Sequence, residues 1–292
     1  MKELHESDLQ IGDILIFENQ DFDAMHLWSI LRNDKHSWED NMYSAAFYLL
    51  LYLIPWFDPG DEGDDYKNIY HAAIWGNIDP FKGSVRTQLF ESKIVQAGTS
   101  GIGSAHLYDT MIGHGVKNVY VCRRKEQLTG FFDKITKATR GLHNQTDIQY
   151  SYETAWLLAV ICSLRYSDGA LYEMLKAKLG KTGADLMVTA IQMLINKYND
   201  EHQKEMVACS TLVGMIYKNA GFQLAIEDHK EKKDPEIHMP AALDFRGFDW
   251  IPGFKTDTNI PKVNIKETVV TPRQLMESPD VEIIGYFPYK GS

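Results

Sequence analysis

Three residues far apart in the chain have side chains that together could carry out nucleophilic catalysis at a carbonyl group. Cys209 provides a thiol, His71 an imidazole that can act as a base, and Gln96 an amide that can orient the imidazole. A cysteine hydrolase needs these three functions within hydrogen-bonding reach of one another. The elements that carry them must therefore meet in the fold.

Cys209 opens a predicted helix over residues 207–222, whose apolar residues recur at helical spacing and which ends at Gly221, a typical C-cap. Ser210 and Thr211 follow the cysteine, and their hydroxyls suit a first helical turn. The positive end of a helix favours a thiolate, so we expect the pKa of the thiol to fall from about 8.5 toward neutrality. The alternative is that Cys209 is a small buried apolar residue, as most unpaired cysteines are.

His71 and Gln96 each interrupt an otherwise apolar run that predicts a buried strand, IYHAAIWGN at 69–77 and KIVQAG at 93–98. A buried amide is costly unless it makes a hydrogen bond. If the two strands are antiparallel neighbours, Gln96 can accept from one imidazole nitrogen and leave the other nitrogen facing the thiol. The alternative for His71 alone is a core histidine with one backbone hydrogen bond.

Two further strands are predicted, one at 11–17, which begins with a Gly-Asp turn, and one at 118–124. Before the second of these, residues 98–109 have the composition of a glycine-rich loop. No Lys-Ser or Lys-Thr pair follows its glycines, so the pattern is a weak match to a phosphate-binding loop.

The remaining segments complete an α+β protein, with a cysteine helix on a largely antiparallel sheet. Helical insertions are predicted at about 20–57 and 126–200, the second with a break at Gly141. Residues 271–287 predict a capped helical turn followed by a last strand. We expect the whole chain, 1–292, to form a single domain.

The composition argues against several classes of protein. The 292 residues are 44% hydrophobic and 24% charged, as in ordinary globular proteins. A net charge of -10 argues against nucleic-acid binding and against strong attraction to anionic lipid.

The N-terminal residues lack the apolar stretch of a signal peptide, which favours the cytoplasm, while export by another route stays open. The apolar run 45–57 is too short to span a bilayer and indicates a buried helix ending before Pro55; an interfacial membrane helix is the minor alternative.

The other cysteines and histidines do not suggest a second site. Three cysteines are an odd number without framework spacing, which argues against a disulfide scaffold. Cys162 falls in the middle of a predicted helix, away from its positive end, and Cys122 falls in a core strand. The spacing of His106, His114 and Cys122 fits no close pair of zinc ligands. We expect no metal and no cofactor.

The order of these features resembles the NlpC family of papain-like cysteine peptidases, in particular its circularly permuted, YiiX-like branch. The Gly-Asp strand, the strand with His71, the strand with Gln96 and the CSTLV helix start follow one another in the permuted order. The segment 271–287 is similar to the threonine-proline segment that closes YiiX-like chains. Two positions depart from the family pattern: Ala208 stands where Asp often precedes the cysteine, and Gln96 where His or Glu is often found.

The resemblance implies a permuted papain-like fold and a thiol hydrolase. Cys209 would attack an amide carbonyl, His71 would act as base and then as acid, and Gln96 would hold the imidazole, as an amide does in other papain-like enzymes. The expected partner is a small substrate: a peptide, a cell-wall peptide or an N-acyl amino compound. Alternatives are an acyltransferase or thioesterase acting on lipid or acyl substrates, and a non-catalytic binding module that uses the same cleft.

Two further residues are assigned to substrate binding, Tyr70 and Ser210. An oxyanion hole would use the backbone N–H of Cys209 and a second donor, for which Tyr70 or a residue in 10–20 are candidates. The oligomeric state stays open.

Overall fold

The chain forms mixed helical and antiparallel-sheet structure, seen in a computed structural model. The described residues are 1–37, 40–41, 44–45, 48, 51–52, 54–55, 66, 68–78, 93–98, 101–126, 128–144, 148–149, 176, 181, 184, 205–206, 209–226 and 270–289. Cys162, most of the apolar run 45–57 and most of the predicted insertion beyond residue 144 lie outside them. No helix among the described residues is long and apolar enough to cross a membrane.

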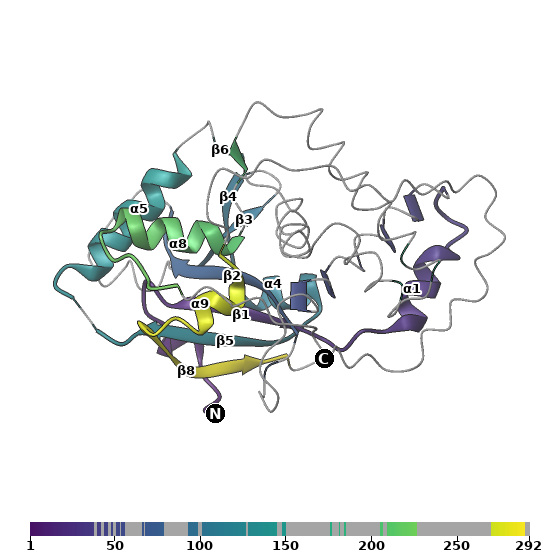
Figure 1. Ribbon diagram of the computed structural model, residues 1–292, viewed down its shortest axis with the longest axis horizontal. Coiled ribbons are helices and arrows are strands. Elements are labelled where there is room, and N and C mark those ends of the chain that lie inside the picture. The colour runs from purple at the N-terminus through teal and green to yellow at the C-terminus, as the bar shows by residue number, and fades with distance from the viewer. Residues whose placement is uncertain are drawn as a thin grey trace.

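A six-stranded antiparallel sheet forms the centre of the molecule (Figure 1), and its strand order is β4-β3-β2-β1-β5-β8. The strands predicted from apolar runs are all present. Their bounds are β1 Ile14–Asn19, β2 Ile69–Gly76, β3 Lys93–Gly98, β4 Gly101–Ala105, β5 Val116–Arg124 and β8 Val281–Pro288. A separate parallel pair joins β6 (Ile148–Gln149) to β7 (Glu205–Met206).

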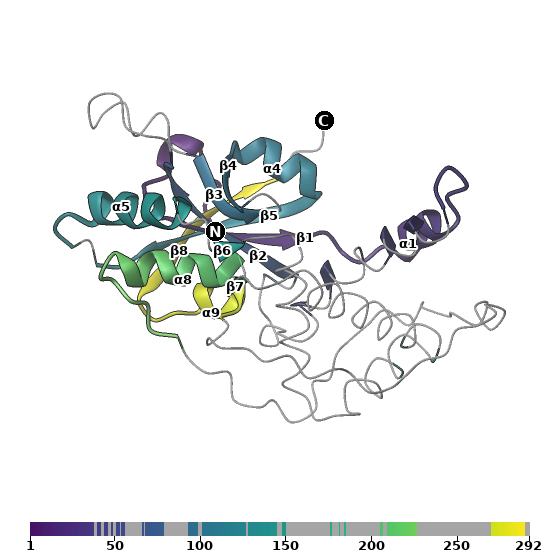
Figure 2. The ribbon, with the colours of Figure 1, turned by 90° about the horizontal axis from the view of Figure 1, so that it is seen from above.

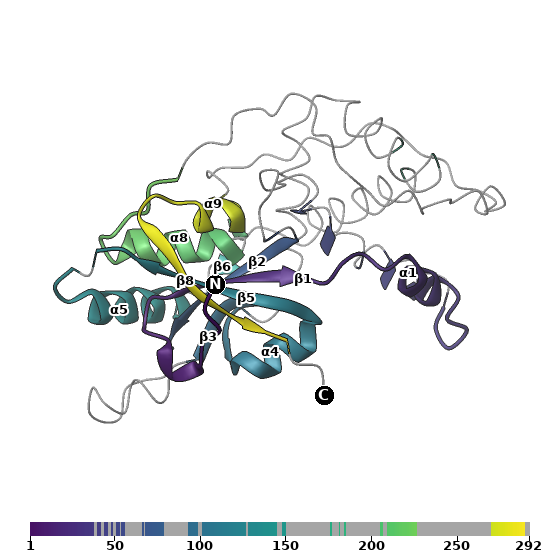
Figure 3. The ribbon, with the colours of Figure 1, turned by 90° about the horizontal axis from the view of Figure 1, so that it is seen from below.

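Helices cover the sheet. The described helices are η1 Glu6–Asp8, α1 Ala24–Leu31, α4 Leu107–His114, α5 Phe131–His143, α8 Cys209–Asn219 and α9 Pro272–Met276. Figures 2 and 3 show α5 and α8 side by side, with α9 next to α8, while α1 lies away from the sheet beyond the end of β1. The predicted α+β class is therefore present, with the cysteine helix on the sheet.

One face of the sheet packs against α8, α5 and α9 to form the main core. Because side chains alternate along a strand, Ile16, Ala72 and Ile74 project from this face, and Leu212 and Ile216 of α8 pack over them. All five side chains are fully buried, and each of the larger ones contributes about 1.5–3 kcal/mol. Burial of this helix face holds Cys209 at the sheet.

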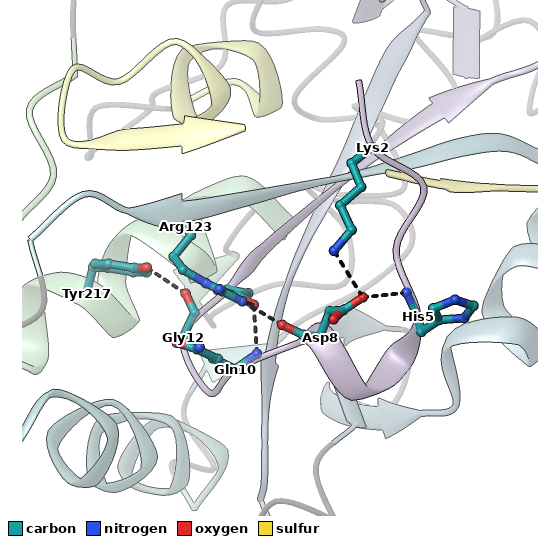
Figure 4. Close-up of polar contacts among 8 residues, drawn as sticks. Lys2, His5, Asp8, Gln10, Gly12, Arg123 and Tyr217 are labelled. Atoms are coloured by element: carbon teal, nitrogen blue, oxygen red, sulfur yellow. Dashed lines mark hydrogen bonds and ion pairs between the residues drawn. The ribbon is translucent and has the colours of Figure 1, made fainter. Parts of the chain in front are cut away.

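The Gly-Asp turn before β1 connects this core to β5 and α8. Gly12 has φ +97, and its N–H donates to the Trp75 carbonyl at 2.8 Å. The next residue, Asp13, accepts from the Trp75 N–H through its backbone carbonyl, also at 2.8 Å. This is the geometry of a G1 bulge, which requires a positive φ and so favours glycine. The Tyr217 hydroxyl donates to the Gly12 carbonyl at 2.6 Å, and Figure 4 shows the ring directed at that oxygen.

An ion pair between the buried Asp13 and the partly exposed Arg123 holds the other side of the same turn. Arg123 of β5 donates through Nε and Nη2 to the two carboxylate oxygens of Asp13, at 2.8 and 2.7 Å. The same guanidinium reaches the Asp8 carbonyl at 2.8 Å (Figure 4). The Asp13 carboxylate also accepts from the Gln10 backbone N–H at 2.7 Å, and it raises the pKa of Arg123. A bidentate pair of this kind fixes both partners in one orientation.

Local sequence chemistry ends α8 and begins α9, as predicted. Gly221 has φ +82, and the Phe222 N–H donates to the Tyr217 carbonyl at 2.9 Å, which makes the C-terminus of α8 a Schellman motif. At the start of α9, the Thr271 hydroxyl accepts from the Gln274 N–H (3.1 Å) and the Thr271 N–H donates to the Gln274 side chain (2.9 Å). This is a capping box.

One prediction about local structure is wrong. Within the predicted loop 98–109, Gly101–Ala105 form β4, which pairs with β3, and α4 begins at Leu107. Small residues in an edge strand have the same composition as a loop, which explains the error. α5 ends at His143, two residues beyond the predicted break at Gly141, and its buried Phe131 and Ile135 belong to the main core.

The close contact at Gly12 predicts a strong effect of adding one methyl group. A Cβ at Gly12 would lie 2.6 Å from the Phe131 ring and would have to adopt a positive φ. We expect Gly12→Ala to lower the free energy of unfolding by about 3 kcal/mol or more in urea titrations.

Gly115→Ala is the matched control, because Gly115 also has a positive φ (+60) but a Cβ there meets nothing within 4 Å. Its cost should be about 1–2 kcal/mol. Equal losses in the two variants would show that the Phe131 contact does not constrain the turn.

Candidate functional site

His71 lies in β2 and is buried. It pairs with Phe17 of the neighbouring strand β1, and the centroids of the two rings lie 5.0 Å apart. On β2 the neighbouring Tyr70 ring lies 6.0 Å from the imidazole and is itself buried. The side chain of His71 is only 7% exposed, so the imidazole has a nearly dry environment.

The structure brings Gln96 to His71, as predicted. The imidazole Nε2 lies 2.8 Å from the Gln96 Oε1. A carbonyl oxygen can only accept, so Nε2 carries the proton in this arrangement and Nδ1 keeps its lone pair. That tautomer leaves Nδ1 as the nitrogen that can take up a proton.

The strand pairing explains how Gln96 reaches the ring. The last residue pair between β2 and β3 is Ile74 with Val95. Beyond it, β3 still pairs with β4, and Gln96 is opposite Gly103. Directly opposed residues of antiparallel strands share a face of the sheet, so Gln96 projects from the same face as His71. The half-buried side-chain amide of Gln96 therefore reaches the His71 ring in the region beyond the last β2–β3 pair.

Burial keeps the imidazole neutral. It lowers the pKa of His71 to about 4, and the hydrogen bond to Gln96 offsets only part of that change. At neutral pH the ring is therefore a neutral base rather than an imidazolium cation.

Cys209 is the first residue of α8, and its side chain is buried at 3% exposure. Burial raises the pKa of the thiol, although hydrogen bonds to the sulfur from the backbone N–H groups of Ala72, Ser210 and Cys209 act in the opposite direction. The expectation that the helix N-terminus brings this pKa toward neutrality is wrong. The amides at the helix start do favour the thiolate, but the loss of water around the sulfur outweighs them.

The contact with Ala72 places the sulfur beside His71 along β2. Ala72 follows His71 directly, so the N–H that bonds the sulfur belongs to the peptide unit of the histidine carbonyl. The Ala72 side chain faces α8 and the His71 side chain faces the other way. A hydrogen bond between Cys209 and the His71 Nδ1 stays a prediction.

Ser210 has a structural role in this arrangement. Its side chain is fully buried, and its hydroxyl donates to the backbone carbonyl of Val270, which precedes the capping box of α9. The hydroxyl has one proton, so it lowers the pKa of Cys209 only when it turns from the Val270 carbonyl to the sulfur. The hydroxyl thus links the cysteine to the C-terminal segment, and the assignment of Ser210 to substrate binding stays a prediction, as does that of Tyr70.

Cys122, the other cysteine among the described residues, lies in β5 and is fully buried. Burial and the nearby Asp13 carboxylate raise the pKa of its thiol. This thiol fits the predicted core role. In the part of the chain that the structure describes, no group of three or more His, Cys, Asp or Glu side chains could hold a metal ion.

Sequence reasoning missed three features of this region. The Asp13–Arg123 pair joins residues 110 positions apart, and the Tyr217–Gly12 bond joins residues 205 apart. The Ala72 amide has no signature in the sequence, because any residue except proline would supply the same N–H.

Comparison of the chain with protein-family models, with curated proteins and with solved structures found no match.

The depressed pKa of His71 predicts how stability depends on pH. An imidazole with a pKa of about 4 in the folded state and 6.5 in the unfolded state binds its proton more readily after unfolding. The contribution of the neutral imidazole to the free energy of unfolding is fully present above pH 6.5 and is lost as the pH falls toward 4. Between pH 7.5 and 4.5, the wild type should lose about 2–3 kcal/mol more unfolding free energy than His71→Gln, measured by urea titration.

His36→Gln is the control, since His36 is exposed. This variant should follow the wild type at both pH values. If His71→Gln also follows the wild type, the imidazole is not held neutral by burial.

Proposed function

We propose that the protein is a thiol hydrolase of the permuted papain-like type, which cleaves an amide bond in a peptide, a cell-wall peptide or an N-acyl amino compound. The observation that carries the proposal is the 2.8 Å contact between His71 Nε2 and Gln96 Oε1, next to a cysteine sulfur bonded to the amide that follows His71. A buried imidazole with a fixed tautomer and a thiol at a helix start are the parts that such a reaction needs.

The charge states favour one order of events. Both the thiol and the imidazole are neutral in the resting protein, since burial raises one pKa and lowers the other. As the sulfur attacks the carbonyl carbon, Nδ1 of His71 takes the thiol proton and the carbonyl oxygen becomes an oxyanion. The C–N bond then breaks, His71 returns the proton to the leaving amine, and the acyl group stays on sulfur.

Water completes the cycle in the same site. His71 removes a proton from a water molecule, which attacks the thioester and releases the acid and the free thiol. Throughout, Gln96 accepts from Nε2–H and so keeps Nδ1 as the proton acceptor. As imidazolium forms, its positive charge strengthens that hydrogen bond.

The arrangement of elements also supports the proposal. The Gly-Asp strand, the histidine strand, the glutamine strand and the cysteine helix lie in one sheet domain, and α8 packs on β2 and β3. This is the order for which the sequence resembles permuted papain-like proteins. An acyltransferase or thioesterase would use the same acyl-enzyme, and the identity of the acceptor distinguishes it from a hydrolase.

A substrate panel with matched variants tests the proposal. p-Nitrophenyl acetate, dipeptides, N-acyl amino acids and phospholipids would be assayed for product release, and acylation of Cys209 would be followed by mass spectrometry. Cys209→Ala should abolish both signals. His71→Ala should reduce turnover by about 10³-fold and Gln96→Ala by about 10- to 100-fold, because an orienting group contributes less than the base itself.

Cys122→Ala is the control for removal of a buried thiol, and it should keep near wild-type turnover. Circular dichroism would establish that each variant is folded. Turnover that survives Cys209→Ala would contradict the proposal. A wild type that is acylated by none of the substrates would favour the binding-module alternative.

A further inference from the structure

The imidazole of His71 lies in a row of side chains that crosses one face of the sheet. Directly opposed residues of neighbouring antiparallel strands share a face, and the register pairs His71 of β2 with Phe17 of β1. On the other side of β1, Phe17 pairs with Val119 of β5, which in turn pairs with Phe287 of β8. Phe17 is therefore next to the imidazole in this row. Phe287 lies two strands beyond Phe17, about 10 Å away at the usual strand spacing.

A β-bulge follows the pair of Phe17 and His71. The next residue of β1, Glu18, pairs with Ile69, so Tyr70 is an extra residue on β2. Such an extra residue changes the direction of nearby side chains. The Tyr70 ring lies 6.0 Å from the imidazole, although neighbouring side chains of a regular strand point to opposite faces. Phe17 thus packs against His71 at the point where the regular pairing of the two strands stops.

Phe17 and Gln96 contact the imidazole from opposite sides of β2, because β1 and β3 are its two neighbours in the sheet. The ring centroids of Phe17 and His71 lie 5.0 Å apart with their planes tilted by 59°, and the Gln96 Oε1 lies 2.8 Å from Nε2. The hydrogen bond fixes one atom of the imidazole. It leaves the ring plane free to rock, because χ2 of histidine has broad minima. The bulky ring of Phe17 restricts that motion.

Phe17 also keeps water away from the imidazole. Its side chain is fully buried, and a phenylalanine ring buries about 150–250 Å². A smaller side chain would leave a space beside His71 and Gln96, two polar groups to which a water molecule could bond. Burial, to which Phe17 contributes, is the main cause of the low pKa of His71. The Gln96 hydrogen bond is the other cause, and no charged side chain of the described residues is among the causes.

We propose that Phe17 is a positioning residue for His71: its ring keeps the imidazole in the orientation that brings Nε2 to Gln96, and it excludes water from that side of the site. This inference rests on the proposed thiol-hydrolase function where it concerns turnover, because Nδ1 must accept the thiol proton in that reaction. Phe17 acts through His71 and needs no contact with a substrate. If Phe17 were a core residue only, its loss would lower stability and leave the titration of His71 unchanged.

The test compares two phenylalanines on the same face of the sheet. Phe17→Leu removes the ring next to His71. Phe287→Leu is the matched control, because Phe287 is also buried, at 1% exposure, and both substitutions leave a cavity of the same kind. The pKa of His71 would be measured by NMR titration of the ring. Acylation of Cys209 by p-nitrophenyl acetate would be measured by burst kinetics between about pH 4 and pH 8.

Phe17→Leu should raise the pKa of His71 by about one or more from its value of about 4, because water then reaches the ring. The acylation rate constant at pH 8 should fall by about tenfold with little change in KM, because a mobile imidazole is less often in position. The acid limb of the pH profile of kcat/KM should move up with the pKa. Phe287→Leu should keep the His71 pKa within about 0.3 and the rate constant within about twofold of the wild type.

Phe17→Met, with Phe287→Met as its control, keeps the inference testable if the leucine variant does not fold. Methionine fills most of the same volume without a rigid ring. Because most of the water stays excluded, the pKa of His71 should rise less than in Phe17→Leu. The acylation rate constant should still fall by about three- to tenfold, since the ring plane is no longer held.

The possible failures are distinguishable. If the wild type is not acylated at Cys209, the proposed function fails, while the pKa of His71 in the two leucine variants still tests the contact with Phe17. If Phe17→Leu and Phe287→Leu change the pKa and the rate constant alike, Phe17 is a core residue only and the inference is overturned. Slower acylation in Phe17→Leu with an unchanged His71 pKa and pH profile also overturns it, because the imidazole then keeps its environment without the ring.

Discussion

The turn at Gly12 and Asp13 is the constraint on which the arrangement of the sheet and the cysteine helix depends. Its carbonyl accepts from Tyr217 at the C-terminal half of α8, and its carboxylate holds Arg123 of β5 in a bidentate pair. Asp13 is buried while Arg123 is partly exposed, so loss of Arg123 would leave a buried carboxylate without its charged partner. The turn thus fixes the helix from its far end, and the apolar face of α8 determines where Cys209 meets β2.

Burial determines the chemistry that the site can perform. The same dry environment lowers the pKa of His71 and raises that of Cys209, so an ion pair at rest is not favoured. Neutral partners can still react when proton transfer accompanies attack. Fixed donors are most effective where water is excluded, because the field of an amide dipole is less screened there. A strand amide and a helix amide are such donors.

The sequence predicts the elements of this fold better than their environment. Apolar runs identify the strands that carry His71 and Gln96, and the unusual presence of two polar residues there correctly predicts their contact. Gly221 and Thr271 carry local signals that depend only on neighbouring residues, and both end or begin helices as expected. The strand β4 is missed because Gly101 and Gly103 have no side chain that distinguishes an edge strand from a loop.

Other properties depend on contacts that the sequence does not encode locally. The thiol pKa of Cys209 follows from how completely that side chain is buried, and a helix-start argument alone gives the wrong sign. The free direction of the Ala72 N–H follows from where the pairing of β2 with β3 ends. Such features arise from long-range packing, and any residue type except proline at position 72 would leave the N–H in place.

The pairing of Cys209 with the lone-pair nitrogen of His71 is the central claim, and a long-range ¹H–¹⁵N spectrum of the His71 ring tests it most directly. At pH 7 the account predicts a neutral ring with its proton on Nε2, and a clear change in the Nδ1 resonance when Cys209 is replaced by alanine. A proton on Nδ1, or an Nδ1 resonance that Cys209→Ala leaves unchanged, would contradict it.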